Sequence, residues 1–180
     1  MKTNNILNQI AQQLVVPGKG LLAADESHKT IHGRFEKRGI PQTEEKRRAY
    51  RELFFSTRGI EQGLSGVILH DETIRQTDAS DILFPHVLRA RGIAVGIKVD
   101  KGIVELPNFK DEKVTEGLDG LRARLLEYKE LDAVFTKWRG VFTVGKELPS
   151  FQCIEANAYL FAQFAAASQE AGLVPIVEPE

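Results

Sequence analysis

Acidic and basic residues recur at the ends of predicted strands, and these residue types can hold an anionic substrate and move protons. The six residues are Asp25, Lys98, Lys137, Arg139, Glu178 and Glu180. If they were buried together, each charge would cost several kcal/mol unless it were paired. For any one of them, a structural ion pair is the more frequent explanation. Charge at the same end of consecutive strands instead favours a site that binds an anion and tunes the pKa values of its members.

Segments typical of strands alternate with segments typical of helices. We expect strands over residues 20–25, 63–70, 93–100, 133–139 and 174–178. We expect helices over residues 6–14, 29–38, 43–56, 84–90, 116–130 and 150–171. Thr43 is a favourable N-cap and Gly172 a favourable C-cap. This alternation predicts parallel βαβ units.

An open doubly wound sheet and a (β/α)8 barrel both consist of such units. Side chains alternate along a strand, so the charges at three strand ends share faces in pairs: Lys98 with Asp100, Lys137 with Arg139, and Glu178 with Glu180. An open sheet gathers its ligand at one switch point. A barrel takes functional residues from the ends of several strands, so we predict an α/β fold of the (β/α)8 TIM-barrel type.

The predicted barrel is incomplete. A whole barrel has eight strands and usually about 250 residues, whereas this chain has 180 residues and five predicted strands. We therefore expect one domain, residues 1–180, that forms the N-terminal part of a barrel and covers about its first five strands.

Composition excludes several classes of partner. The net charge of −1 gives no electrostatic basis for binding nucleic acid or an anionic membrane. No apolar run approaches the ~20 residues that span a bilayer, and the N-terminus lacks the core of a signal peptide. The single cysteine, Cys153, reads as a small core residue and fits a reducing compartment. We expect a cytoplasmic protein and, because the four histidines lack metal-ligand spacing, no metal.

Six segments, taken in order, resemble the class I fructose-bisphosphate aldolases. They are residues 22–27 (LAADES), 66–73 (GVILHDET), 96–102 (GIKVDKG), 116–120 (EGLDG), 137–139 (KWR) and 174–180 (VPIVEPE). A short motif such as KWR is weak by itself. Six motifs in order at compatible strand positions are a strong signal, and they extend over most of the chain.

The resemblance implies an enzyme of glycolysis and gluconeogenesis that reversibly cleaves fructose 1,6-bisphosphate through a lysine Schiff base. It implies a homotetramer that needs no cofactor, and it places the Schiff-base lysine on a sixth strand, beyond this chain. The implied catalytic residues are Asp25 and Glu178, which transfer protons, and Lys137, which stabilises developing charge. The implied substrate-binding residues are Ser27, Thr30, Arg34, Arg47, Lys98 and Arg139.

Several alternatives stay open. Arg34 and Arg47 could lie on solvated helix faces, and Glu180 could be a structural partner of Lys98 or Lys137. The family commonly has a small residue where this chain has His28 and Lys29, and we expect Lys29 to be exposed. The protein could also be a different Schiff-base aldolase acting on a monophosphate. Finally, the chain could be an inert half-barrel that folds or associates only with a missing segment.

Overall fold

Five runs of apolar and small residues form a parallel sheet. In the computed structural model, which describes residues 2–180, the strands are β1 (Gly20–Ala24), β2 (Leu64–Leu69), β3 (Ala94–Lys98), β6 (Phe135–Gly140) and β7 (Val174–Pro179). They lie in the order β1-β2-β3-β6-β7, and each pairing is parallel. This order is that of successive βα units in part of a (β/α)8 barrel, as predicted from the sequence.

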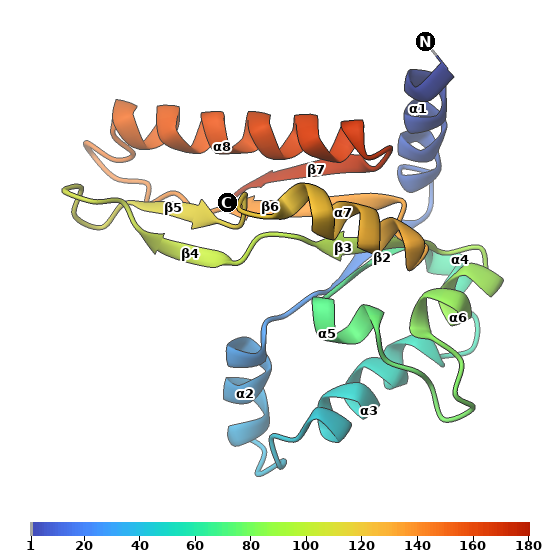
Figure 1. Ribbon diagram of the computed structural model, residues 1–180. Helices are drawn as coiled ribbons and strands as arrows, with labels where there is room; N and C mark the ends of the chain where they lie inside the picture. Colours follow the sequence, from blue (N-terminus) through green and yellow to red (C-terminus); the bar gives the residue numbers. More distant parts are fainter. Residues whose placement is uncertain (1) are drawn as a thin grey trace.

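Helices follow the strands and cover one side of the sheet, except the first helix, which precedes β1 and places Leu14 on the other side. The longer ones are α1 (Lys2–Leu14), α2 (His28–Glu36), α3 (Glu44–Phe55), α6 (Phe84–Ala90), α7 (Leu121–Glu130) and α8 (Phe151–Glu170). Two single turns, α4 (Ile60–Gly63) and α5 (Asp71–Ile74), flank β2. Ser27, Thr43 and Ser150 accept a backbone N–H at the starts of α2, α3 and α8, as N-caps do. In Figure 1, α8 lies along β7, while α1 stands near the beginning of that strand.

The predicted helix over residues 116–130 is wrong in its first turn. Glu116 ends β5 (Lys113–Glu116), which forms an antiparallel hairpin with β4 (Gly102–Glu105), and α7 begins at Leu121. Gly117 and Gly120 have φ angles of 133° and 66°, which an α-helix does not accommodate. The spacing of leucines after Gly117 gave the helical pattern, and these two glycines delay its start.

The sheet has a different core on each face. Between the sheet and the helices, Val95, Ile97 and Val99 are at most 2% exposed. Trp138 packs there against Phe164, with ring centroids 5.4 Å apart. On the other face, a smaller cluster forms around Phe135 and includes Leu14 from α1 and Ile68 from β2. Cys153 is buried, as predicted.

Gly96 leaves room for the ring of Phe135. A Cβ atom at position 96 would lie 2.2 Å from Cε2 and Cζ of that ring. We expect Gly96→Ala to lower the free energy of unfolding by about 1–3 kcal/mol, the cost of overpacking, as measured by urea denaturation. Gly33→Ala is the control, because its Cβ would enter open space in α2 and should stabilise by about 0.5–1 kcal/mol. Equal urea midpoints for Gly96→Ala and Gly33→Ala would contradict the close contact between position 96 and the Phe135 ring.

Candidate active site

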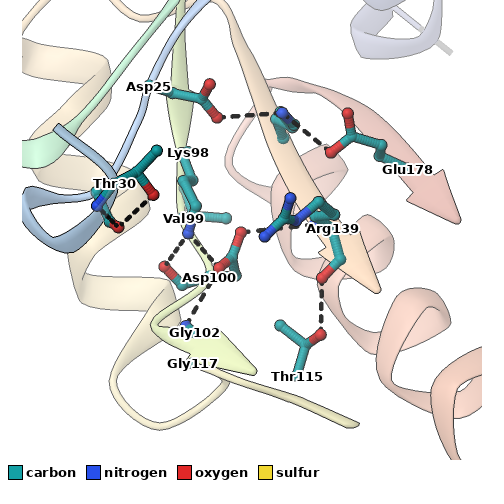
Figure 2. Close-up of polar contacts among 12 residues, drawn as sticks. Asp25, Thr30, Lys98, Val99, Asp100, Gly102, Thr115, Gly117, Arg139 and Glu178 are labelled. Atoms are coloured by element: carbon teal, nitrogen blue, oxygen red, sulfur yellow. Dashed lines mark hydrogen bonds and ion pairs between the residues drawn. The ribbon is translucent and has the colours of Figure 1, made fainter. Parts of the chain in front are cut away.

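Lys137 lies between two carboxylates contributed by the first and last strands of the sheet. Asp25 follows β1, Lys137 is in the middle of β6, and Glu178 is near the end of β7. The Lys137 Nζ atom is 3.2 Å from Asp25 Oδ2 and 3.0 Å from Glu178 Oε2. Figure 2 shows both carboxylates joined by dashed lines to the amine between them. The three residues predicted to be catalytic are therefore in direct contact.

Two neighbouring carboxylates keep this buried amine charged. Asp25 is 6% and Lys137 is 7% exposed. Burial alone opposes a positive charge on Lys137, but the attraction of Asp25 and Glu178 outweighs it and holds the pKa of Lys137 above its ordinary value. The group is an ammonium at neutral pH. It is suited to stabilising negative charge and unsuited to nucleophilic attack, which needs a free amine.

Lys98 and Arg139 meet at a buried carboxylate beside this triad. Lys98 forms an ion pair with Asp100 and donates to its main-chain carbonyl at 3.2 Å. The Asp100 side chain, 2% exposed, also accepts from the backbone N–H of Gly102 at 3.2 Å and of Arg139 at 3.5 Å. Figure 2 shows Asp100 between Lys98 and Arg139. Asp100 thus holds the side chain of Lys98 and the backbone of Arg139, although sequence reasoning assigned it no role.

The partner of Glu180 differs from the expected one. Its Oε2 atom accepts from Arg139 Nη1 at 3.0 Å, whereas the sequence suggested Lys98 or Lys137. In the parallel register, Arg139 is opposite Glu178, two residues before Glu180, and Lys137 is opposite Ile176. Each glutamate therefore contacts the basic residue that lies opposite the position two residues before it. Glu178 contacts Lys137, and Glu180 contacts Arg139.

Three further predicted substrate residues lie in or next to α2, Ser27 and Thr30 at its start and Arg34 in its last turn. Ser27 Oγ is 3.1 Å from Thr30 Oγ1 and accepts the Thr30 N–H at 3.4 Å. Arg34 forms an ion pair with Glu26 and donates to the Tyr50 hydroxyl at 3.1 Å. Its side chain is 54% exposed, so it is accessible to a ligand. Lys29 is exposed, as expected.

Arg47 is bound by Glu72 of α5 and by the main chain of Gln42. Its Nε donates to Glu72 Oε1 at 2.8 Å, and Nη1 donates to the Gln42 carbonyl at 3.3 Å. Its side chain is only 17% exposed, so the solvated helix face considered from the sequence is wrong. Glu72 also accepts His28, whose Nε2 is 3.2 Å from Oε2. Arg47 therefore anchors α3 to α5 in this structure.

Arg51 and Glu26 form a contact that sequence reasoning missed. Arg51, 1% exposed, forms an ion pair with Glu26 and donates from Nη2 to the Glu26 carbonyl at 2.9 Å. Glu26 stands between Asp25 and Ser27, so the buried arginine fixes the backbone that presents both. The available signal was spacing, because Arg47 and Arg51 are four residues apart and lie on one side of α3.

The charge on Glu26 links fold stability to pH. Burial would raise the pKa of Glu26, but Arg51 and Arg34 hold it below its ordinary value of 4.5. A lowered pKa in the folded state stabilises the protein above the unfolded value, and this contribution is lost as the pH falls. We expect the free energy of unfolding to decrease as the pH drops below about 4.5. Urea denaturation at a series of pH values measures this, and a Glu26→Gln variant should show a shallower decrease.

Across residues 2–180, no cluster of three or more histidine, cysteine, aspartate or glutamate side chains has a metal-binding arrangement. In that range no helix combines the length and the apolar character needed to cross a membrane.

Comparison with known proteins supports the resemblance seen in the motifs. The family model described as “Fructose-bisphosphate aldolase class-I” matches residues 6–180. A “Probable fructose-bisphosphate aldolase class 1” of Xanthomonas campestris is 54% identical over 97% of this chain, and the match covers 52% of that protein. A “Fructose-bisphosphate aldolase” of Drosophila melanogaster is 48% identical over 97% of this chain and 48% of its own length.

A solved structure shares the fold. Plasmodium falciparum fructose-bisphosphate aldolase, in a complex with TRAP and a small-molecule inhibitor, superposes with a TM-score of 0.96 at 42% identity. The match covers 99% of this chain and 52% of that one. The chain therefore spans about half the length of the relatives it matches, and the five-stranded sheet corresponds to half of a barrel.

Proposed function

Because this chain belongs to the class I fructose-bisphosphate aldolase family, we propose that it supplies half of an active site that reversibly cleaves fructose 1,6-bisphosphate. The products are dihydroxyacetone phosphate and glyceraldehyde 3-phosphate, formed through a lysine Schiff base. The observation that carries the proposal is the Lys137 ammonium held between Asp25 and Glu178. A cation between two carboxylates, at the end of parallel barrel strands, is suited to proton transfer next to a developing negative charge.

In the proposal, Glu178, Asp25 and Lys137 have different roles in the reaction. Glu178, with its side chain 38% exposed, is the more accessible carboxylate and transfers protons, while its buried Oε2 atom faces the Lys137 ammonium. Asp25 assists carbon–carbon cleavage by accepting a proton at Oδ2, while Lys137 stabilises the oxyanion that develops beside it. The raised pKa of Lys137 makes it a poor Schiff-base amine. This agrees with a separate Schiff-base lysine on a further strand, as the family resemblance implies.

The basic and hydroxyl side chains position the substrate. In the proposal, Ser27 and Thr30 contact a phosphate through their hydroxyls and the first N–H groups of α2. Arg34 reaches the same phosphate by exchanging its contact with Glu26, and Lys98 and Arg139 orient the sugar near the triad. Arg47 contributes through its ion pair with Glu72. The proposed role belongs to glycolysis and gluconeogenesis, in a cytoplasmic homotetramer.

A second candidate is a catalytically inert half-barrel. Two observations favour it: β1 and β7 end the sheet with one neighbour each among the described strands, and the chain spans half its relatives' length. Strand edges of this kind pair readily with another segment. On this proposal the chain acts only by associating with the strands that complete the barrel.

Intact mass spectrometry separates the two candidates. The protein is measured before and after borohydride reduction with fructose 1,6-bisphosphate. A mass above that of 180 residues, increased further by a trapped triose phosphate, supports the enzyme. A mass of 180 residues without an adduct supports the inert half-barrel. Peptide mapping of the adduct adds a second check, because a label on Lys98 or Lys137 would contradict the proposed division of roles.

A further inference from the structure

A basic depression lies at the carboxyl ends of β2 and β3, beside the Lys137 triad. Its volume is about 530 Å³, and Ser27 and Lys98, two of the predicted substrate residues, line it. The charged side chains in its wall are the basic Arg75, Lys98, Lys101 and Arg124 and the acidic Asp71 and Asp100. Because the basic groups outnumber the acidic ones, this depression favours an anion.

His70 lines the same depression and has one ring nitrogen committed to the fold. It follows β2 directly, and its Nδ1 accepts the backbone N–H of Glu72 at 3.4 Å, which caps α5. A nitrogen that accepts a hydrogen bond carries no proton, so the neutral ring has its hydrogen on Nε2. Nε2–H is therefore the donor that remains for a ligand.

The surroundings of His70 keep its ring neutral. Burial is the main cause that lowers the pKa of His70, and electrostatic interactions with His28, Lys98 and Arg51 lower it further. Asp71 acts in the opposite direction, more weakly. These groups face His70 from α2, β3, α3 and α5. The His28 ring centroid is 5.1 Å from that of His70, and His28 has its own acidic partner in Glu72, which Arg47 also holds.

We propose that His70 is a further substrate-binding residue, whose Nε2–H donates to an oxygen of a phosphomonoester held between Ser27 and Lys98. The inference rests on the proposed function, since it places the phosphate of the sugar in this depression. A neutral donor adds a directed hydrogen bond without adding charge. The charge of Lys98 is already partly neutralised by its ion pair with Asp100. Specificity for a bound phosphate therefore comes from the directed hydrogen bonds of the Ser27 hydroxyl and the His70 imidazole.

Nuclear magnetic resonance of the histidine nitrogens tests the proposal on the 180-residue protein, with inorganic phosphate as the probe. We expect His70 to have its hydrogen on Nε2, and phosphate to shift that resonance together with the amides of Ser27 and Lys98. His86 is the internal control, since it pairs with Asp132 at 3.4 Å. Its resonances should not move.

Two substitutions distinguish the role of His70 as a phosphate donor through Nε2–H from its role as the N-cap of α5. His70→Asn keeps a side-chain oxygen able to cap α5 but lacks an atom at the Nε2 position. It should weaken phosphate binding about fivefold, the effect of losing one hydrogen bond. His70→Gln places an amide N–H near the Nε2 position and should bind phosphate more tightly than His70→Asn.

The outcomes distinguish this inference from the proposed function. Shifts at Ser27 and Lys98 without a shift at His70 would overturn the inference and leave the phosphate site standing. Unchanged affinity in His70→Asn, or a hydrogen on Nδ1, would do the same. Phosphate that moves none of these resonances overturns both.

Discussion

Replacing Lys137 by methionine should lower kcat/KM for fructose 1,6-bisphosphate cleavage by at least about 10²-fold, the usual cost of losing one preorganised charge-stabilising group. Methionine keeps a similar length and apolar stem but removes the ammonium between Asp25 and Glu178. Developing negative charge would then lie beside two carboxylates with no cation. Steady-state kinetics of the barrel completed with its C-terminal half measures the effect.

The control for this prediction is a lysine at the opposite end of the sheet. Lys129 lies in the last turn of α7 and donates to the Ala171 carbonyl at 2.7 Å. Lys129→Met should leave kcat within about twofold, because it changes no charge near the triad. If Lys137→Met retained full turnover while Lys129→Met did not, the proposed role of Lys137 would be wrong.

Replacing Arg51 by methionine should lower the free energy of unfolding by about 3–5 kcal/mol, the cost of removing one partner of a buried ion pair. Arg51 is 1% exposed and holds both the carboxylate and the main-chain carbonyl of Glu26. The lost contacts also release the backbone between Asp25 and Ser27. Urea denaturation followed by circular dichroism at neutral pH measures the loss.

Arg34 offers a matched comparison, since it pairs with the other carboxylate oxygen of Glu26. Its side chain is 54% exposed, so Arg34→Met should cost at most about 1 kcal/mol. If Arg51→Met and Arg34→Met lowered the free energy of unfolding equally, burial would not be what determines how much each arginine stabilises the protein.

Much of the fold could be predicted from the sequence because its signals are local. Alternating apolar residues place Val95, Ile97 and Val99 on one face of β3, and the N-cap Thr43 marks the start of α3. Parallel strands end at the same edge, so their terminal charges had to gather there. These rules predicted that Asp25, Lys137 and Glu178 gather with the other charged residues at the strand ends, and the family resemblance singled out these three as catalytic.

The partners of those charges depended on tertiary structure. Sequence reasoning paired Glu180 with a lysine, but the stagger between β6 and β7 brings it to Arg139. It left Arg47 open between substrate binding and a solvated helix face, and it overlooked Arg51, which packs from α3 against Glu26. It began a helix at residue 116, although Gly117 and Gly120 delay the start to Leu121, and it made no prediction for β4 and β5. Side-chain periodicity is set within one segment, whereas an ion pair depends on the register and packing of segments distant in the chain.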